Sequence, residues 1–505
     1  MLTPRINRSL CVLAASYFLL FGCGGKVDDQ YPNSEVIARV GDRVITKSEF
    51  IRRVEYTPRP TYCRGDNSIH KKIVLNSLIA EKLLALDILS KPEFKSPDQF
   101  DNYIKGRREQ AMRQLYRYEH GPKLVSTTDE ELKRSFKNAS REFNLGFITL
   151  PDSQYAHTVR TFLDEGESFE SVYARIFGTE ELEIKELTWF DDEERIIRDA
   201  LYSQPVERGA IVGPLKLSDG KHLILKVIGW NDKMQLSESA NQTLWEDVVS
   251  KVEERKGNKL FNEHTADLMR GKSFILDEST FRVVVDDLAE KYLMKESDKG
   301  SMLNQVIWDM EKQHLAVSDS DLNASHLNQK LFRFDNEDWS VQDFYDLVAS
   351  HPLVFREKSF EMSDFARQVK LSIADLLKDH IITGEAYANG YSDRKEIVSY
   401  EQMWQDQYFS GIYKEIIRFS ISDSTMQSSN SIPFIEGYMN PIIDSLQTAY
   451  SNDIYINFDA YEDVKLTRID MFVAQDNVPY PVVVPPFPQI TTDYVFDYGS
   501  KLESE

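Results

Sequence analysis

Hydrophobic and polar positions first become regular at residues 36–45, where two short apolar runs flank a Gly-Asp pair. This pattern predicts a β-hairpin with a tight turn. Thr46 is followed three residues later by Glu49, and this capping-box spacing predicts that a helix begins there. Apolar residues at near-helical spacing then predict two long helices, over about 75–88 and 100–118.

The same order of elements returns in the second half of the chain. Residues 331–334 are mostly apolar, an Asp-Asn pair follows, and Ser340 and Asp343 repeat the spacing of the first capping box. The apolar pattern at 371–386 then predicts a helix like the first long one. We interpret residues 331–420 as a second copy of the first module. The alternative is coincidence, because a hairpin followed by a capped helix is a common local arrangement.

A different pattern lies between these two copies. Over residues 126–230, short helical stretches alternate with strand-like runs, and the last two runs, 209–217 and 221–228, flank a Ser-Asp-Gly turn. This pattern predicts one small α+β domain. An apolar stripe over 244–268 then predicts a long helix, which we expect Gly257 to weaken.

The last part of the chain, residues 421–505, has a different composition. It begins with a Ser-rich stretch, and its patterns predict a short helix at 442–446 and a strand at 454–456. Residues 482–488 must be extended, because their prolines lack the N–H that a helix needs. We treat this part as a C-terminal extension without an assigned role.

The N-terminus has the pattern of a targeting segment. Two arginines precede an apolar stretch, residues 10–21, which is followed by Gly22 and Cys23. This arrangement resembles the bacterial lipobox, and the resemblance implies that residues 1–22 are removed and that Cys23 carries a lipid. The alternative is an ordinary signal peptide. The residue after the cysteine is glycine rather than aspartate, which favours sorting to the outer membrane.

Composition narrows the classes of partner and cofactor. The formal net charge is -22, which argues against binding to nucleic acid or to anionic lipid surfaces. A hydrophobic content of 41% is typical of a globular protein. Of the three cysteines only Cys63 lies beyond the predicted lipidation site, so no internal disulfide is expected. The histidines have no metal-ligand spacing, and we expect no metal and no cofactor.

Several weak motifs resemble one protein family when they are taken in order. The hairpin of residues 36–46 and the run at 78–84 resemble the N-terminal module of SurA-like and PrsA-like periplasmic foldases. The middle unit resembles their parvulin domain, a peptidyl-prolyl isomerase of the PpiC type. The matching segments there are 166–169, 188–190, 209–215 and 219–227.

The patterns and the resemblance together predict an α+β fold, in which mainly helical chaperone modules hold an inserted parvulin-like α+β domain. The predicted organisation is a lipoprotein signal peptide (1–22), a tether (23–35), a SurA-N-like helical module (36–125), a degenerate parvulin-like domain (126–230), a helical connection that completes the chaperone core (231–330), a second SurA-N-like module (331–420) and the C-terminal extension (421–505).

The chemistry of a parvulin centre needs neither a nucleophile nor a cofactor. Rotation about an X–Pro bond meets a barrier of about 18–20 kcal/mol, and the enzyme has to favour the twisted amide. In the family, two facing histidines with a nearby Cys or Asp form the centre, while a Met and a Phe line the proline pocket. The resemblance maps the second histidine onto His222 and the first onto Phe147. It implies that the substrate-binding positions are Ile197, Glu194, Trp189 and Phe190.

Because Phe147 can neither donate nor accept a hydrogen bond, weak or no isomerase activity is expected. The resemblance therefore implies a lipoprotein of the periplasmic side of the outer membrane that binds unfolded or outer-membrane client polypeptides. One alternative is an active isomerase with an atypical centre around His222, which would need an Asp, Ser or Tyr opposite it. A second alternative is an envelope scaffold lipoprotein that is not a chaperone.

Overall fold

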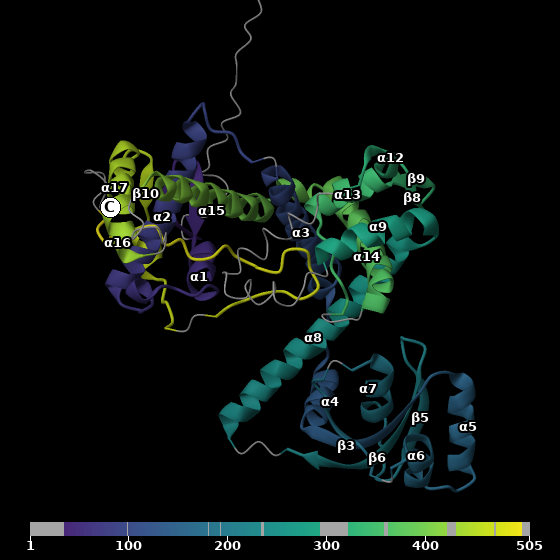
Figure 1. The fold of residues 1–505 in the computed structure, drawn as a ribbon. Helices are drawn as coiled ribbons and strands as arrows, with labels where there is room; N and C mark the ends of the chain where they lie inside the picture. The colour runs from purple at the N-terminus through teal and green to yellow at the C-terminus, as the bar shows by residue number, and fades with distance from the viewer. Residues whose placement is uncertain are drawn as a thin grey trace, which may run out of the picture. The chain divides into compact units, whose positions relative to one another are not determined.

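The computed structural model describes residues 35–97, 99–179, 181–191, 193–233, 237–292, 322–357, 362–421, 431–468 and 471–496. The chain divides into two compact units (Figure 1). The first unit is Met1–Met112 with Ser273–Glu505, and the second is Arg113–Lys272. The described residues form an α+β protein that is mainly helical, which confirms the predicted class. Cys23 and the predicted lipobox lie outside the described residues.

The first unit combines three-stranded sheets with long helices. Its elements in chain order are β1 (Val36–Val40), β2 (Arg43–Thr46), α1 (Lys47–Glu55), α2 (Ser68–Ser90), α3 (Phe100–His120, shared with the second unit), β7 (Phe274–Leu276), α9 (Glu278–Tyr292), α12 (Ala324–Leu327), β8 (Lys330–Phe334), β9 (Glu337–Ser340), α13 (Val341–Ser350), α14 (Phe365–Ala388), α15 (Lys395–Ser420), α16 (Ile432–Phe434), a π-helical turn (Ile435–Met439), α17 (Asn440–Ala449), β10 (Ile454–Ile456) and α18 (Phe458–Glu462).

The two predicted capping motifs start helices as expected. The Thr46 hydroxyl oxygen accepts a hydrogen bond of 3.0 Å from the backbone N–H of Glu49 at the start of α1. At the start of α13 the motif is reciprocal: Ser340 Oγ accepts from the N–H of Asp343, and the Asp343 carboxylate accepts from the N–H of Ser340. These bonds pair backbone donors that the first turn of a helix leaves free.

The two hairpins also recruit a third strand in the same way. The sheets have the strand orders β10-β1-β2 and β7-β8-β9. In each hairpin the pairing shifts by one residue directly after the first residue pair, which is Val36 with Thr46 in one hairpin and Lys330 with Ser340 in the other. Equivalent pairs are Ala38 with Ile45 and Ile456 in one sheet, and Phe332 with Trp339 and Leu276 in the other.

The likeness extends to the hydrogen bonds that follow each third strand. The backbone N–H of Asn457 donates to the carbonyl of Ile37, and that of Asp277 donates to the carbonyl of Leu331, both at 2.9 Å. Each of these residues precedes a helix, α18 and α9 respectively. The third strand of the first hairpin comes from near the C-terminus, whereas that of the second hairpin precedes it in the chain. The domain boundaries drawn from the sequence stay a prediction.

The C-terminal part of the chain belongs to the same core as the N-terminal hairpin. Ile37 and Leu78 are fully buried, and they share a hydrophobic cluster with Ile443 of α17 and with Phe487. Residues 480–496, which we call the strap, contain no helix or strand apart from one bridge at Val482. The stretch that the sequence separated as an extension is therefore part of the first unit's core where the structure describes it.

Side chains of the helices satisfy the carbonyl groups of the strap. Arg107 of α3 donates to the carbonyl of Val482 at 2.6 Å, and Arg53 of α1 donates to that of Pro486 at 3.0 Å. Buried carbonyls need such partners, and a Pro-rich segment cannot obtain them from a regular ladder. Large buried cations on α1 and α3 thus take the place of a neighbouring strand.

Candidate functional site

The second unit holds the residues that sequence reasoning assigned to a catalytic centre. It contains a short 3₁₀ turn (Pro122–Leu124), α4 (Asp129–Ala139), β3 (Arg141–Leu150), α5 (Ser153–Asp164), α6 (Phe169–Phe177), β4 (Ile184–Thr188), α7 (Arg195–Tyr202), β5 (Ile211–Lys216), β6 (His222–Asp232) and α8 (Glu238–Met269). The sheet is antiparallel with the order β4-β3-β6-β5. Residues of α5 and α6 pack on one face of it, and residues of α7 pack on the other.

His222 is the first residue of β6 and is half-buried. It pairs with Leu150 on β3 and with Lys216 on β5, so neither residue opposite it is an Asp, a Ser or a Tyr. Its Nδ1 atom is buried and has no hydrogen-bond partner among the residues that the structure describes. The polar neighbour that an atypical isomerase centre would need is therefore missing from these two register positions.

The register places Phe147 away from His222. Residues paired across antiparallel strands point to one face of a sheet, and successive residues of a strand point to opposite faces. Phe147 pairs with Leu225, three residues beyond His222, and the β3–β6 pairing is regular between them. The two side chains therefore lie on opposite faces. Phe147 packs in the apolar cluster that contains Ile197 of α7, which is 6% exposed.

Tyr202 belongs to the same apolar cluster and brings a hydroxyl group to it. The single proton of the Tyr202 hydroxyl lies between the carbonyls of Arg141 and Leu187, which are 3.2 and 3.3 Å from the hydroxyl oxygen. Burial raises the pKa of Tyr202, so this phenol stays protonated across the physiological range. Because its proton is already bonded to the backbone, Tyr202 holds α7 to the sheet and does not replace a catalytic histidine.

Glu194 has a local structural role. Its carboxylate accepts one hydrogen bond from the backbone N–H of Ser218 and another from the Ser218 hydroxyl, both at 2.9 Å. Glu194 precedes α7, and Ser218 lies in the turn between β5 and β6. The carboxylate thus ties the helix to this hairpin, at a position where the family resemblance implies a proline-pocket methionine. Its role in substrate binding stays a prediction.

Trp189 and Phe190 lie in another cluster of the second unit. Trp189 is 7% exposed and packs with Leu132 of α4 and Val248 of α8. The guanidinium of Arg255 lies 4.5 Å from the Trp189 ring centroid and donates to its backbone carbonyl at 2.7 Å. The predicted substrate-binding residues therefore lie in three environments: Ile197 in the cluster of Phe147, Glu194 at the Ser218 turn, and Trp189 with Phe190 against α4 and α8. Their part in substrate binding stays a prediction.

Helix α8 is continuous through Gly257, where the sequence predicted a weak point. A Cβ atom at this position would lie 2.9 Å from the backbone of Pro122. The close approach of the 3₁₀ turn to α8 therefore explains why this residue is a glycine.

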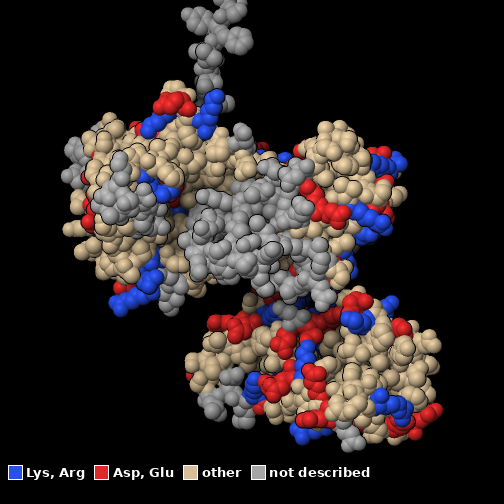
Figure 2. Space-filling view, in the orientation of Figure 1, with Lys and Arg blue, Asp and Glu red and all other residues tan. Residues whose placement is uncertain are grey.

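Figure 2 shows acidic side chains crowded on the drawn face of the second unit, with basic side chains among them.

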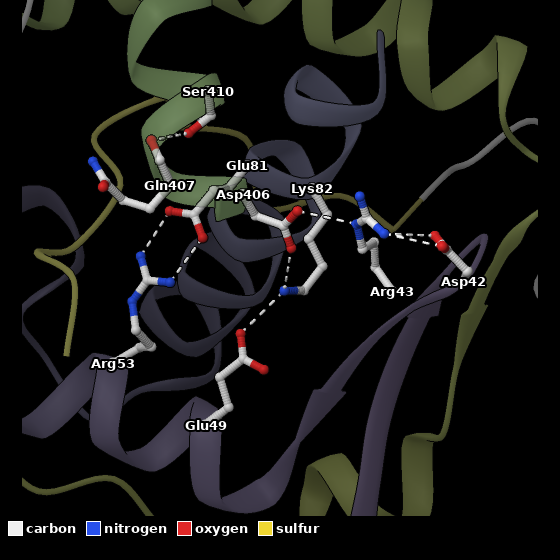
Figure 3. Close-up of polar contacts among 9 residues, drawn as sticks. All are labelled: Asp42, Arg43, Glu49, Arg53, Glu81, Lys82, Asp406, Gln407 and Ser410. Carbon is white, nitrogen blue, oxygen red and sulfur yellow. Dashed lines mark hydrogen bonds and ion pairs between the residues drawn. The ribbon is translucent and has the colours of Figure 1, made fainter. Parts of the chain in front are cut away.

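A second constellation of chemistry-bearing groups is buried in the first unit (Figure 3). Arg53 of α1 and Glu81 of α2 form two hydrogen bonds of 2.7 Å each, with both side chains almost fully buried. Lys82 of α2 contacts the carboxylates of Glu49 and Asp406, at 3.1 and 3.2 Å. This cluster, which we call the buried ion network, joins α1 and α2 to α15.

The charges of the buried ion network support one another. Burial opposes the charged forms, but the carboxylates of Glu49 and Asp406 raise the pKa of Lys82 above its ordinary value. Burial likewise opposes the charge of Arg53, but the carboxylates of Glu81, Glu49 and Asp406 together outweigh it and raise the pKa of Arg53. Both cations therefore remain charged at neutral pH. The network is closed to substrate because its central groups are about 1% exposed or less, so we assign it a structural role.

Sequence reasoning missed this network, although a signal was present. Glu81 and Lys82 interrupt the apolar run of α2, and a charge pair inside such a run indicates buried partners.

Among the described residues, no group of three or more His, Cys, Asp or Glu side chains could hold a metal ion. No helix in the same residues has the length and apolarity that crossing a membrane requires.

Comparison with known proteins adds one relative. No protein-family model matches the chain. Over 235 residues it is 26% identical to the foldase protein PrsA of Geobacillus sp. (strain WCH70), and the alignment covers 44% of this chain and 83% of the relative. The chain is homologous to a PrsA foldase. This homology confirms the PrsA-like part of the resemblance drawn from the sequence.

Solved PrsA structures give low-scoring superpositions. The peptidylprolyl isomerase PrsA of Bacillus anthracis has a TM-score of 0.21 at 14% identity, with 38% of this chain and 96% of that chain covered. PrsA of Bacillus cereus has a TM-score of 0.21 at 17% identity, with 47% and 92% covered. At these TM-scores the superpositions carry no information about function.

Proposed function

We propose that this PrsA-like chain is a membrane-anchored folding factor of the cell envelope that binds unfolded or outer-membrane client polypeptides. In this proposal its parvulin-like domain, residues 126–230, has weak or no isomerase activity, and SurA-like modules surround it. The homology to a PrsA foldase carries the proposal. We place the protein on the periplasmic side of the outer membrane, held there by a lipid on Cys23.

Two features of the described residues support client binding over catalysis. Neighbouring large apolar side chains are exposed on both units, Ile176 with Phe177 (49%) on α6 and Ile416 with Phe419 (74%) on α15. Adjacent exposed apolar groups are what a chaperone offers to unfolded chains. His222 and Phe147 lie on opposite faces of the sheet, and the residues paired with His222 are Leu150 and Lys216. A centre that twists an amide needs a hydrogen-bonded group beside it, which this arrangement does not supply.

The soluble protein lacking residues 1–23 should suppress the aggregation of an unfolded protein without accelerating cis–trans exchange of a Xaa-Pro peptide. Uncatalysed exchange takes tens of seconds or longer, so a catalysed phase would be evident in a peptide assay. His222→Ala should leave both readouts unchanged. Catalysis that disappears in His222→Ala would instead establish the alternative, an active isomerase with an atypical centre. Absence of both activities would favour the scaffold alternative.

Replacing Cys23 by alanine should release the protein from membranes, because the anchor in this proposal is the lipid on its thiol. The measurement is the share of protein in the membrane pellet after fractionation of expressing cells. Cys63→Ala is the control, because Cys63 is fully buried in the first unit and should leave the distribution unchanged. Equal membrane association of Cys23→Ala and the parent protein would contradict the lipid anchor.

A further inference from the structure

A polar groove lies in the first unit, between the end of the strap and the helical segment that begins at the π-helical turn. Its volume is about 510 Å³, within the range of pockets that hold small molecules. The lining residues on the helical side repeat at intervals of three or four, so one helix face forms one wall. The groove is lined by Glu436, Asn440, Asp444, Gln447, Thr448, Thr492, Asp493, Tyr494 and Val495.

The groove is strongly acidic. Its lining includes the carboxylates of Glu436, Asp444 and Asp493 and contains no lysine or arginine. Within the described residues, the carboxylates of Glu436 and Asp444 have no ion pair. The Asp493 carboxylate accepts from the backbone N–H of Val495 at 3.0 Å and from the side-chain amide of Asn76 at 3.5 Å. Burial and the charge of Asp493 together raise the pKa of Asp444, which shows that the carboxylates repel one another.

A buried amide in the same groove lacks a partner. The Gln447 side chain is only 4% exposed, and its Nε2 has no hydrogen-bond partner among the residues that the structure describes. A buried donor left unpaired is destabilising, so Nε2 is a group that a water molecule or a ligand in the groove could satisfy. A ligand that also pairs with Nε2 would bring a hydrogen-bond acceptor close to its positive charge.

The chemistry of the lining residues narrows the class of ligand that the groove can bind. The carboxylates are not grouped closely enough to hold a metal ion, within the part of the chain that the structure describes. A lysine or arginine residue of a polypeptide offers both required groups, because its side chain carries the cation and its backbone carries a carbonyl. Glu436 also lies on the π-helical turn, a rare backbone form that is frequent at functional sites.

We propose that this groove binds a lysine or arginine residue of an unfolded polypeptide. Asp444 and Asp493 hold the cationic side chain, Glu436 strengthens the local negative charge, and Gln447 Nε2 donates to the adjacent backbone carbonyl. This proposal rests on the proposed function and adds to it a preference for basic residues in the clients.

The test uses the full chain in detergent and two fluorescent, unstructured peptides that differ only in carrying arginine or glutamine at two central positions. The arginine peptide should bind about tenfold more tightly, because arginine brings the positive charge that the carboxylates attract and glutamine does not. Asp444→Asn should remove most of this difference. Asp459→Asn is the control, because it removes the same charge from an exposed position outside the groove.

The amide is tested separately. Gln447→Met keeps the size of the side chain and removes the donor, so it should weaken the arginine peptide by about threefold to tenfold. It should leave binding of n-butylguanidine unchanged, because that probe has the cation and no carbonyl. An unchanged thermal midpoint establishes that the variant is folded. Equal losses for both probes would overturn the assigned role of Gln447.

Two further outcomes separate this groove from the proposed function. If aggregation is suppressed but the arginine and glutamine peptides bind equally, the groove proposal is wrong and the chaperone proposal stands. If aggregation is not suppressed but binding of the arginine peptide depends on Asp444, the groove stands and the chaperone proposal is wrong. Equal effects of Asp444→Asn and Asp459→Asn would reduce the groove to general charge attraction and overturn it.

Discussion

Replacing Asp406 by alanine should lower the free energy of unfolding of the first unit by about 3–5 kcal/mol, the range for breaking a buried ion pair. Its carboxylate is fully buried and accepts from Arg43 at 3.0 Å and from Lys82 at 3.2 Å. Without it Lys82 would remain buried, with the carboxylate of Glu49 at 3.1 Å. The measurement is urea denaturation followed by tryptophan fluorescence, to which the buried Trp404 of the same helix contributes.

Asp42→Ala is the matched control for this prediction. Asp42 pairs with the same arginine, Arg43, at 3.0 Å, but its side chain is 63% exposed. Exposed pairs are worth about 0–1 kcal/mol, so this variant should shift the unfolding midpoint little. Similar losses for the two variants would mean that burial does not set the strength of the network. That result would contradict the conclusion that buried charges of the network hold α15 to α1 and α2.

Replacing Gly106 by alanine should destabilise the first unit by about 3 kcal/mol or more, at or beyond the upper end for overpacked cores. A Cβ atom there would lie 2.1 Å from the backbone oxygen of Ser350 and 2.2 Å from the Tyr480 hydroxyl. Those two groups form a hydrogen bond of 3.0 Å that joins the strap to the end of α13. A backbone carbonyl cannot move aside as a flexible side chain does, so α3 or the strap must shift.

Gly384→Ala provides the comparison, because Gly384 is also inside a helix, α14, and a Cβ atom there would meet nothing within 4 Å. Alanine is favoured over glycine in a helix by about 1 kcal/mol, so this variant should be neutral or stabilising. Both proteins are compared by their urea midpoints. If Gly106→Ala were as stable as the parent, the close approach of α3, Ser350 and the strap would be refuted.

Local structure was largely predictable from the order of residues. Thr46 and Ser340 cap helices as their spacing indicated, because a hydroxyl three residues before a free backbone N–H needs no tertiary partner. The long helices α2 and α14 follow the apolar spacing for the same reason. Gly257 was misread as a weak point in α8, because its cause is contact with Pro122, which lies far away in the sequence.

The candidate centre could be predicted only in part. The strand that holds His222 could be assigned from its pattern, but its pairing with the strand of Phe147 and the faces on which the two residues lie depend on the tertiary structure. A slip of one residue moves every side chain to the other face, and no single strand contains that information. The roles of Glu194 at the Ser218 turn and of Trp189 against α8 were equally invisible, because each depends on a contact between separate elements.

By itself, the sequence determined the secondary structure, the mainly helical α+β class and the resemblance to a foldase, because capping, periodicity and turn chemistry act between near neighbours. The tertiary structure alone decided which strand completes each hairpin, where the strap lies and which charges are paired. Asp406 meets Lys82 across 324 positions of the chain, and Gln447 faces a groove whose other wall is the strap. Such contacts are selected by the packing of the whole core, since burying a charge is tolerated only where a distant partner compensates its lost hydration.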